Sequence, residues 1–333
     1  MSYIVYKVNP ETLKRISTVE RVVSFNWQDD IEKVFTSFEF ETAEELACGD
    51  WIELYNSVNK ETVFYGVIFK VSQNGEENFK YIGYDTGIYL EKNEIVKQFK
   101  KKKISQAMRE VCKNGLIQDG IFPDIDLLVT NVYQKKTLSE ILKDLYKIAV
   151  EKGYTDNYFF DCKNRKVNLL ECKENNDLRG YIADLYSIKS FDFIKTCEKS
   201  SSIENLKNRV QIYTSNTANK DNAGKCKYTL PKEPDSESIK KYGLLNHIEE
   251  IDSSTKQNYE KLAETKLEQL DVVKDEISFT VYGDNRLKTG VITHIENKTF
   301  KINTSYKITS TKHTINGTVE TVDMTVEKFN ENL

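Results

Sequence analysis

The sequence predicts an α+β protein in which two β-rich units flank a mixed segment, and three observations support this prediction. From residue 18 to about residue 89, apolar side chains recur with a period of two and no helical pattern interrupts them. Residues 96–196 combine helical and strand patterns. In the last third the period of two returns after a stretch with helical periodicity, so a helical insertion interrupts a second β-unit.

Length and composition agree with a folded chain of more than one domain. The 333 residues, at about 150 per domain, correspond to two or three domains. The chain has 48 Lys and Arg residues and 52 Asp and Glu residues, which gives a net charge of −4. Proteins that bind nucleic acids usually carry an excess of positive charge, so this balance argues against nucleic acid as a direct ligand. The 19 Tyr and 16 Phe residues are typical of strands and of protein interfaces.

Processing signals and cysteines indicate the compartment. The first residues lack the charged and apolar regions of a signal peptide, and no stretch approaches the ~18 apolar residues of a membrane span. The six cysteines are spread singly without a C-x-x-C pair, so we expect reduced thiols, synthesis in the cytoplasm and no membrane partner. Cys162 and Cys172, on one predicted hairpin, are interpreted as small buried residues.

The first β-unit consists of short strands joined by tight turns. Val23, Phe25 and Trp27 alternate with polar residues, and Phe38 and Phe40 continue the pattern in the next strand. Further strands are predicted over residues 51–55, 62–71 and 79–84, with one face of the middle strand formed by Val63, Tyr65, Val67, Phe69 and Val71. Asn74-Gly75 marks a hairpin turn. Consecutive strands without a helix predict an antiparallel sandwich or a small closed barrel.

The middle segment contains two predicted helices and a hairpin. Residues 104–113 have apolar positions at helical spacing, and Asn114-Gly115 ends this helix. Thr137-Leu138-Ser139-Glu140 is a capping box, followed by an apolar stripe that Gly153 terminates. Residues 158–161 and 166–171 are predicted to form a short hairpin. The lysine run at residues 100–103 is interpreted as a solvated lead-in to the first helix, with contact to an acidic partner surface as the alternative.

The last third alternates between the two kinds of pattern. Residues 208–213 predict a strand, and the polar residues 214–229 predict a mobile loop. Helices are predicted over residues 235–242 and 254–274, and the period of two returns from residue 277 onward. The resulting division has a first β-unit at 1–95, a mixed connector at 96–196, a second β-unit formed by 197–229 and 276–329, and a helical insertion at 230–275.

The C-terminal hairpin allows a prediction of register. A two-residue turn at Asn316-Gly317 would pair Ile308 with Thr325 and turn the two apolar rows to opposite faces of the sheet. A three-residue loop at residues 315–317, with Gly317 left-handed and a G1 bulge, pairs Tyr306 with Val326 and Ile308 with Met324 and so unites the rows. We therefore predict the second register.

Signatures of common catalytic and metal sites are absent from the sequence. It contains no G-x-G-x-x-G, G-x-x-x-x-G-K-[ST], H-E-x-x-H or EF-hand pattern, and His247 with Glu250 near a predicted helix is too small a ligand set for a metal. Asp156, Asp161 and Glu171 could lie close together across the predicted hairpin, as glycoside hydrolysis requires, but polar residues at strand ends are the favoured interpretation. We expect no metal and no cofactor.

Several short stretches occur in a distinctive order along the chain. The first β-unit contains Gly49-Asp50-Trp51-Ile52-Glu53-Leu54, then Phe64-Tyr65-Gly66-Val67-Ile68, Tyr81-Ile82-Gly83-Tyr84-Asp85 and Tyr89-Leu90. SIENLKNRV at residues 202–210 enters the second β-unit, and KKYGLL at residues 240–245 opens the helical insertion. In this order, over nearly the whole chain, the pattern resembles the XkdQ/YqbQ-like phage tail proteins, which are related to the late-control gene D hubs.

The resemblance implies structural work rather than catalysis. Such hubs are baseplate proteins of contractile tails, in which a homotrimer with two tube-like barrels per chain adapts a six-fold tail tube to a three-fold central spike. It also implies the partners: further copies of the chain, the tail tube protein, the central spike protein, the tape-measure protein and other baseplate proteins, without stable nucleic-acid binding. The expected location is the bacterial cytoplasm during synthesis and then the baseplate of a virion or of a phage-tail-like bacteriocin particle.

With the resemblance, the predicted fold becomes two antiparallel tube-like β-barrels, a mixed α/β connector and a helical insertion in the second barrel. Exposed edge strands of such barrels can pair with neighbouring copies, and ring closure removes the aggregation hazard of those edges. The candidates for barrel core or interface are large apolar residues of the strands: Trp27, Trp51, Tyr65, Phe69, Tyr306, Ile308, Met324 and Val326.

Two other function classes stay open at the level of sequence. One is a carbohydrate-active hydrolase that uses Asp156, Asp161 and Glu171, and the other is a monomeric β-rich module that binds a peptide or glycan. Two β-units of comparable length are expected for a hub and are not needed by either alternative. No lysozyme-like or peptidase module accompanies the β-units, so we expect no wall-degrading activity in this chain.

Overall fold

The chain forms two units in the computed structural model. Unit 1 comprises Met1–Glu198 and Ile277–Leu333, and unit 2 comprises Lys199–Glu276. The chain is β-rich with few helices, as the sequence predicts, and its sheets are mixed. The structure describes residues 3–73, 75, 78–155, 157–163, 165–174, 194–215, 225–232, 236–252, 258–283, 287–297, 302–317 and 319–329.

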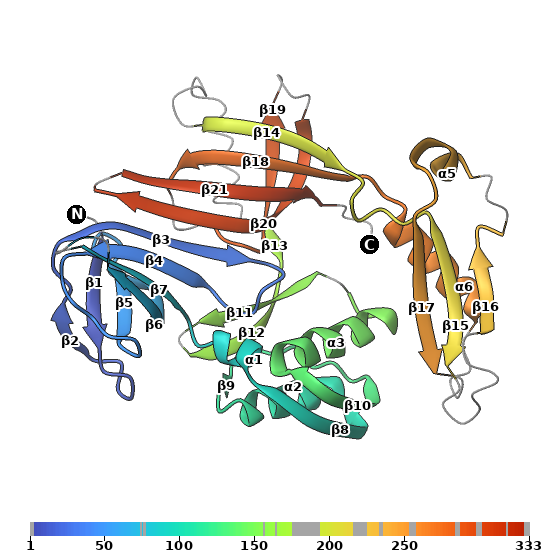
Figure 1. The fold of residues 1–333 in the computed structure, drawn as a ribbon, viewed down its shortest axis with the longest axis horizontal. Coiled ribbons are helices and arrows are strands. Elements are labelled where there is room, and N and C mark those ends of the chain that lie inside the picture. Colours follow the sequence, from blue (N-terminus) through green and yellow to red (C-terminus); the bar gives the residue numbers. More distant parts are fainter. Residues whose placement is uncertain are drawn as a thin grey trace. The chain divides into compact units, whose positions relative to one another are not determined.

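Strands β1–β7 form the N-terminal β-unit of unit 1, drawn in blue in Figure 1. Alternation along the strands turns Phe25, Phe38 and Phe40 inward, where neighbouring rings stack with centroids 5.6–6.0 Å apart. The strands predicted over residues 51–55, 62–71 and 79–84 are confirmed as β5, β6 and β7. In their order of antiparallel pairing, the strands are β3 (Val22–Asp30), β4 (Ser37–Thr42), β7 (Phe79–Tyr84), β6 (Glu61–Gln73), β5 (Trp51–Asn56), β1 (Tyr3–Val8) and β2 (Arg15–Thr18).

The sequence pattern does not predict β1 and β2, and the structure explains how β2 is held. All residues of β2 are exposed. Arg15 donates two hydrogen bonds to Glu53 of β5, at 2.7 and 2.9 Å, and its guanidinium lies 4.2 Å from the ring centroid of Tyr6 and 4.0 Å from that of Tyr55. A bidentate ion pair between two aromatic faces therefore replaces the apolar alternation by which strands are recognised.

The five residues predicted to share one face of β6 do not all lie on the same face. Phe64 and Ile68 point into the core, and the predicted row, which contains Tyr65 and Phe69, lies largely on the other face, with Phe69 38% exposed. The register of β6 against β7 shifts between Ile68 and Lys70, so Phe69 is the extra residue of a bulge. Before the bulge Phe64 and Ile68 face the core, and beyond it Val71 packs against the same core, so a single row of alternate residues does not describe the strand through residue 71.

The C-terminal strands extend the same sheet. β18 (Lys274–Tyr282), β21 (Val319–Lys328) and β20 (Ile302–Asn316) pair in that order, and β20 pairs with β3. One 13-stranded sheet therefore includes both β-units, together with β13 (Lys173–Glu174), β14 (Ile194–Ser202) and β19 (Val291–Asn297). Among the described strands, the pairings form one open series from β14 to β2, and no pairing joins its two ends. The two tube-like barrels therefore stay a prediction.

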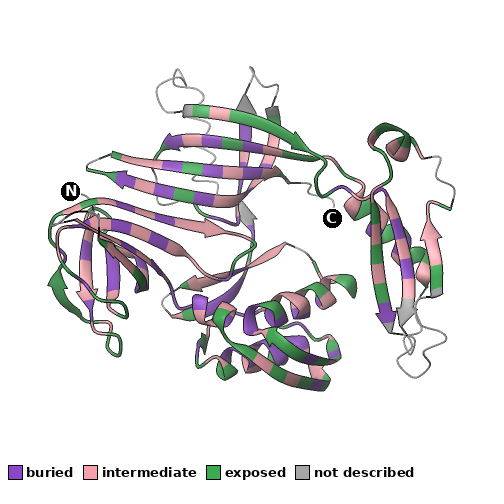
Figure 2. Ribbon diagram, in the orientation of Figure 1, coloured by how far each residue is buried: buried purple, intermediate pink, exposed green. Residues whose placement is uncertain are grey.

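The predicted register of the C-terminal hairpin is wrong, although Gly317 is left-handed as expected, with φ +62°. Ile308 pairs with Val326 and Tyr306 with Lys328, and the register shifts between Ile308 and Ser310. Thr309 is thus a bulge residue, and beyond it the buried positions of β20 change from even to odd numbers. Buried and more exposed residues alternate along β21 (Figure 2). The two apolar rows do meet, but a bulge within the strand brings them together, not a three-residue loop.

The middle segment combines helices with short sheets. Apolar faces of its helices share one core, which includes Met108, Leu142 and Leu145. The predicted helices are confirmed as α2 and α3, whereas the lysine run belongs to a strand, β8, because Ile95, Lys97 and Phe99 already alternate inward before it. The elements are α1 (Ile88–Lys92), β8 (Glu94–Lys103), α2 (Ile104–Asn114), β9 (Gln118–Asp119), β10 (Leu128–Thr137), α3 (Leu138–Glu151), β11 (Tyr158–Lys163) and β12 (Lys166–Glu171).

Unit 2 is a three-stranded sheet covered by a helix. β15 (Arg209–Ser215) pairs with β16 (Lys225–Leu230) and with β17 (Asn246–Asp252), and α6 (Tyr259–Leu270) places Ala263 against Val210 and Ile212. β15 and β16 therefore lie outside the 13-stranded sheet, although the sequence analysis places residues 197–229 in the second β-unit, and β17 is a strand within the predicted helical insertion. β16 occupies part of the predicted loop, of which residues 216–224 lie outside the described residues. The predicted helix at 235–242 is α5 (Glu237–Tyr242), and the longer one ends at Leu270, four residues early, because β18 begins at Lys274. No helix in the described ranges is long and apolar enough to cross a membrane.

The capping box of α3 gives a direct test of local stability. Thr137 accepts a hydrogen bond from the Glu140 amide at 3.1 Å, and the Glu140 carboxylate accepts one from the Thr137 amide at 2.8 Å. Thr137→Ala should lower the free energy of unfolding by about 1 kcal/mol, measured by urea denaturation. Glu140→Gln keeps an acceptor for the Thr137 amide and serves as the control. Equal losses in the two variants would contradict the assigned role of Thr137.

Candidate functional site

The junction of the two β-units is the first candidate site. Residues 310–316 of β20 pair with residues 24–30 of β3 in antiparallel register, and His313 lies directly opposite Trp27. The two rings stack with centroids 4.4 Å apart and planes 7° apart. Both side chains are buried, His313 at 1% exposure and Trp27 at 4%. The junction is therefore a packed interior contact between segments far apart in the sequence.

Polar groups around His313 connect three further positions. His313 Nε2 donates to the Leu287 carbonyl at 2.9 Å, because a carbonyl can only accept. Nδ1 lies 3.1 Å from Glu320 Oε1, and the Tyr3 hydroxyl donates to Glu320 Oε2 at 2.6 Å. Each ring nitrogen of His313 therefore has a polar partner. The network thus satisfies each buried polar atom that it includes.

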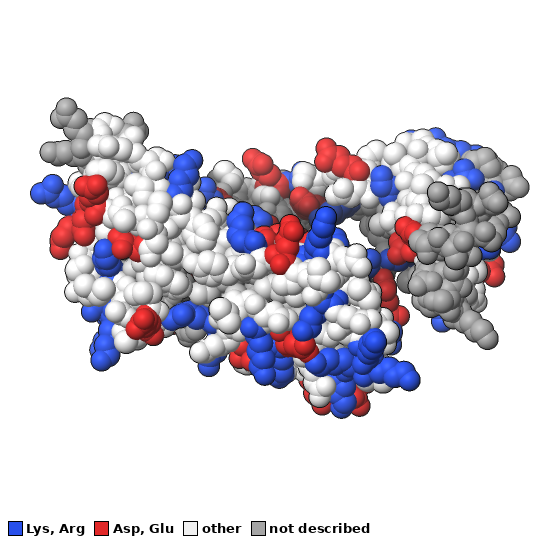
Figure 3. Space-filling view, turned by 60° about the horizontal axis from the view of Figure 1, so that its bottom comes forward, with Lys and Arg blue, Asp and Glu red and all other residues white. Residues whose placement is uncertain are grey.

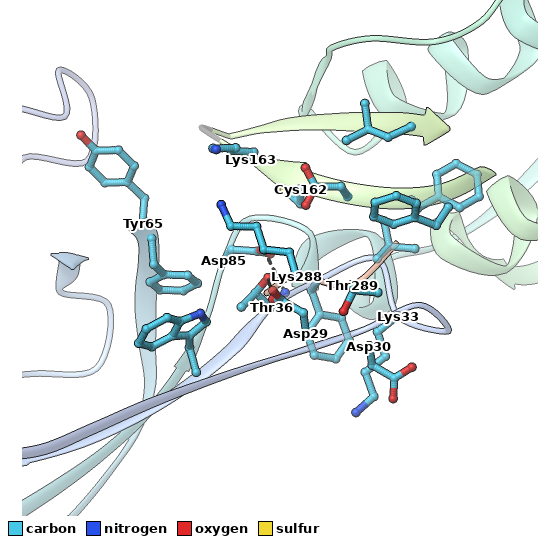
Figure 4. A pocket seen from close by; sticks show the side chains of 18 of the residues that line it. Asp29, Asp30, Lys33, Thr36, Tyr65, Asp85, Cys162, Lys163, Lys288 and Thr289 are labelled. Carbon is cyan, nitrogen blue, oxygen red and sulfur yellow. Dashed lines mark hydrogen bonds between the residues drawn. The ribbon is translucent and has the colours of Figure 1, made fainter. Parts of the chain in front are cut away.

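A pocket lies beside the junction, where several segments of unit 1 meet. Its volume is about 210 Å³, and it is lined by residues of β3 and the loop after it, of β6 and of the β11–β12 hairpin, and by Asp85, Lys288 and Thr289. Figure 4 shows Asp29, Thr36 and Asp85 close together behind Lys288. Asp85 accepts hydrogen bonds from the Thr36 amide at 2.9 Å and the Gly87 amide at 2.7 Å, while Asp29 accepts from the Thr36 hydroxyl at 2.6 Å.

Burial dominates the electrostatics of this pocket. It raises the pKa of Asp85 well above the usual value, and the charges of Asp161 and Asp29 add to this. Burial, together with the Asp29 charge, raises the pKa of Asp161 to about 6. The pKa of Lys288 is lowered, first by burial and then by the charge of Lys163. Burial therefore disfavours the charged forms of Asp85, Asp161 and Lys288 in this pocket.

The pocket offers little to a metal ion. Among the residues that the structure describes, no group of three or more His, Cys, Asp or Glu side chains is placed to hold one. The backbone amides of Thr36 and Gly87 already occupy both oxygens of Asp85. Through these two hydrogen bonds, Asp85 joins the backbone at residue 36 to the backbone at residue 87.

Comparison with known proteins identifies the family. A model of the YqbQ-like family matches residues 25–327. The chain belongs to the YqbQ-like family. A relative of this YqbQ-like chain, the uncharacterized protein YqbQ of Bacillus subtilis (strain 168), is 26% identical over 290 residues, which cover 85% of this chain and 82% of that protein. The resemblance predicted from the sequence is confirmed at the level of the family.

Two solved structures share the fold of this YqbQ-like chain. The tail protein from Neisseria meningitidis MC58 matches with a TM-score of 0.67 at 11% identity, over 98% of this chain and 97% of that chain. The prophage MuSo2 43 kDa tail protein from Shewanella oneidensis matches with a TM-score of 0.65 at 12% identity, over 98% of both chains. The likeness covers both β-units, the middle segment and unit 2 together.

The predicted core or interface residues of the YqbQ-like chain occupy three kinds of position. Trp27 lies at the junction, and Trp51 and Tyr65 are half-buried, with the Arg165 guanidinium 5.3 Å from the centroid of the Trp51 ring. Phe69 is on the surface. The C-terminal four pack in one apolar cluster: Tyr306, Ile308, Met324 and Val326. Sequence reasoning missed His313, Glu320 and Tyr3, because no local pattern signals that they meet.

The structure separates the carboxylates of the hydrolase alternative. Asp161 pairs with Asn168 and Glu171 with Tyr158, so the two acids are three positions apart along the ladder and lie on opposite faces of the hairpin. Asp156 lies outside the described residues. His247 and Glu250 are in β17, not near a helix end, and also face opposite sides. Cys162 lies opposite Val167, and Cys162 and Cys172 are both free thiols.

A variant of His313 tests the junction. His313→Leu removes a donor to the Leu287 carbonyl and leaves Glu320 buried beside an apolar side chain, so the free energy of unfolding should fall by about 3 kcal/mol. Glu320→Gln is the matched control, because its amide can donate to a neutral Nδ1 and accept from the Tyr3 hydroxyl. This variant should lose under about 1 kcal/mol. Denaturant unfolding with similar losses in both variants would contradict the network.

A variant of Asp161 tests the pocket. Its pKa of about 6 lies above the unfolded value near 3.8, so the folded state binds the proton more tightly and stability falls as pH rises from about 4 to about 6. Asp161→Asn abolishes this loss. It should unfold at higher urea concentration than the parent at pH ~8, by on the order of 1 kcal/mol after allowance for solvent, and with no advantage near pH ~4. A gain that does not change with pH would contradict the burial effect.

Proposed function

We propose that this chain is the baseplate hub of a contractile phage tail or a phage-tail-like bacteriocin particle. Three chains would form a ring in which each contributes two tube-like β-units, so that six units continue a six-fold tail tube above a three-fold central spike. The hub is made in the bacterial cytoplasm and assembled into the particle. Its role is structural, not catalytic.

The observation that carries this proposal is the fusion of two β-units into one sheet. The first unit contains β1–β7, and the second contains β18–β21 with β13 and β14. Pairing of β3 with β20 fixes their relative orientation within unit 1. A ring component needs such a rigid pair, whereas a hydrolase or a monomeric binding module does not. The fold shared with two tail proteins supports the proposal.

The partners follow from the same geometry. The proposed hub binds two further copies of itself, the tail tube protein, the central spike protein, the tape-measure protein and other baseplate proteins. Edge strands supply one means of contact, since an exposed edge such as β2 pairs readily with another chain. Among the candidate residues, Phe69 is the one with an exposed aromatic ring on β6, which makes it the first position to test at an interface between copies.

The oligomeric state tests the proposed function. Native mass spectrometry of the purified chain, alone and with the tail tube and spike proteins of the same particle, should give species with three copies of the 38.6 kDa chain. The trimer is expected at least when both partners are present, because ring contacts can form on assembly. A chain that stays monomeric with both partners present would overturn the hub and favour the monomeric binding module.

A further inference from the structure

The two-stranded ribbon formed by β8 and β10 is a surface that the proposed function does not use. In the described part of the chain, these strands pair only with each other, in antiparallel register from Leu128↔Lys103 to Thr137↔Glu94. Each strand therefore has one edge without a strand partner. Such edges are templates for the addition of another chain.

The two faces of the β8–β10 ribbon differ in what they contact. Phe99, Val129 and Tyr133 point inward and join the core shared with α2 and α3. On the outward face Val132 lies opposite Gln98, and Val96 follows two residues along the same strand. Val96 is 74% exposed and Val132 49%, so this face of the ribbon presents two apolar side chains to solvent. An isolated ribbon gains nothing from this arrangement, whereas a partner that covers it does.

The ribbon is strongly basic. β8 and β10 carry seven lysines and one acid, Glu94, in a chain whose net charge is −4. Figure 3 views the molecule with the ribbon side brought forward, and blue side chains gather along the lower part of that face. Lys97 and Lys102 pair with Glu110 of α2, Lys103 with Asp126 and Lys136 with Glu140. Among the described residues no carboxylate pairs with the remaining three, which are Lys100, Lys101 and Lys135.

Two of these lysines occupy costly backbone positions. Lys101 has φ +44° and Lys135 has φ +52°, and the register shifts of the ribbon fall at these two places. Glycine is the usual residue at a left-handed bulge position, since a side chain there costs on the order of 1 kcal/mol. Folding alone would favour glycine at both bulges. Both lysine side chains are exposed, so they are available to a partner.

We propose that the outward face of the β8–β10 ribbon docks an acidic, extended segment of a partner protein. Its carboxylates lie against Lys100, Lys101 and Lys135, and its apolar side chains cover Val96 and Val132. Because successive side chains of an extended segment point to opposite faces, the acidic and apolar residues that meet this face must occupy every second position of the segment. A nucleic acid fits less well, because three unpaired lysines without arginine neutralise few phosphates and the valines meet no base. The inference does not depend on the hub assignment.

The test uses the full chain and a defined probe. The probe is a fluorescein-labelled peptide of about twelve residues that carries Glu and Val in turn at every second position, with Ser between them, and binding is followed by fluorescence anisotropy. We expect binding that weakens as salt rises. The double variant Lys101→Gly and Lys135→Gly should bind roughly tenfold more weakly, while its unfolding midpoint stays equal to the parent value or rises because strain is relieved.

A matched control separates the ribbon from general charge effects. Lys60 is also exposed and left-handed, with φ +56°, and lies in the turn between β5 and β6. Lys60→Gly makes the same chemical and backbone change away from the ribbon and should leave peptide binding unchanged. An equal loss in the control, no loss in the double variant, equal binding of a peptide of Glu alone, or tighter binding of a short DNA duplex would each overturn the proposal.

Discussion

The pairing of β3 with β20 is the constraint on which the rest of unit 1 depends. One edge of β20 bonds to β19 over its first half and to β3 over its second half, while the other edge bonds to β21. Every C-terminal strand therefore reaches the N-terminal β-unit through β20. A slip of one residue in the seven pairs with β3 would turn His313 and Trp27 to the wrong face, so burial of these two rings fixes the register.

The bulge at Thr309 makes this double pairing possible. It lies where β20 exchanges β19 for β3, and the extra residue increases the local twist at that point. Its polar groups are satisfied, since the Thr309 carbonyl accepts from the Ile31 amide at 2.8 Å and its hydroxyl donates to the Thr325 carbonyl at 3.1 Å. The bulge also moves the buried row from Ile308 to Thr311, which keeps one continuous core face along the strand.

The sequence predicts correctly the helices and strands whose signals lie within a few neighbouring residues. The capping box at Thr137 and the alternation from Val22 onward place α3 and most N-terminal strands, because their signals lie within a few residues. The sequence does not predict β2 or β8, because these strands contain charged residues that form ion pairs where an alternating strand would have apolar side chains. The junction could not be found from the sequence. Its residues are up to 317 positions apart, and long-range register carries no local signal.

In the proposed ring, the β3–β20 junction joins two neighbouring β-units within one chain, where a ring of separate units would have an interface between subunits. Three chains with two β-units each have six boundaries between units, of which three lie within chains and three between them. The boundary within a chain is built from backbone hydrogen bonds of β3 and β20 and a stacked aromatic pair, so it is fixed when the chain folds. The boundaries between chains must then match its angle for the ring to close. The fold of one chain therefore sets the geometry that its partners have to meet.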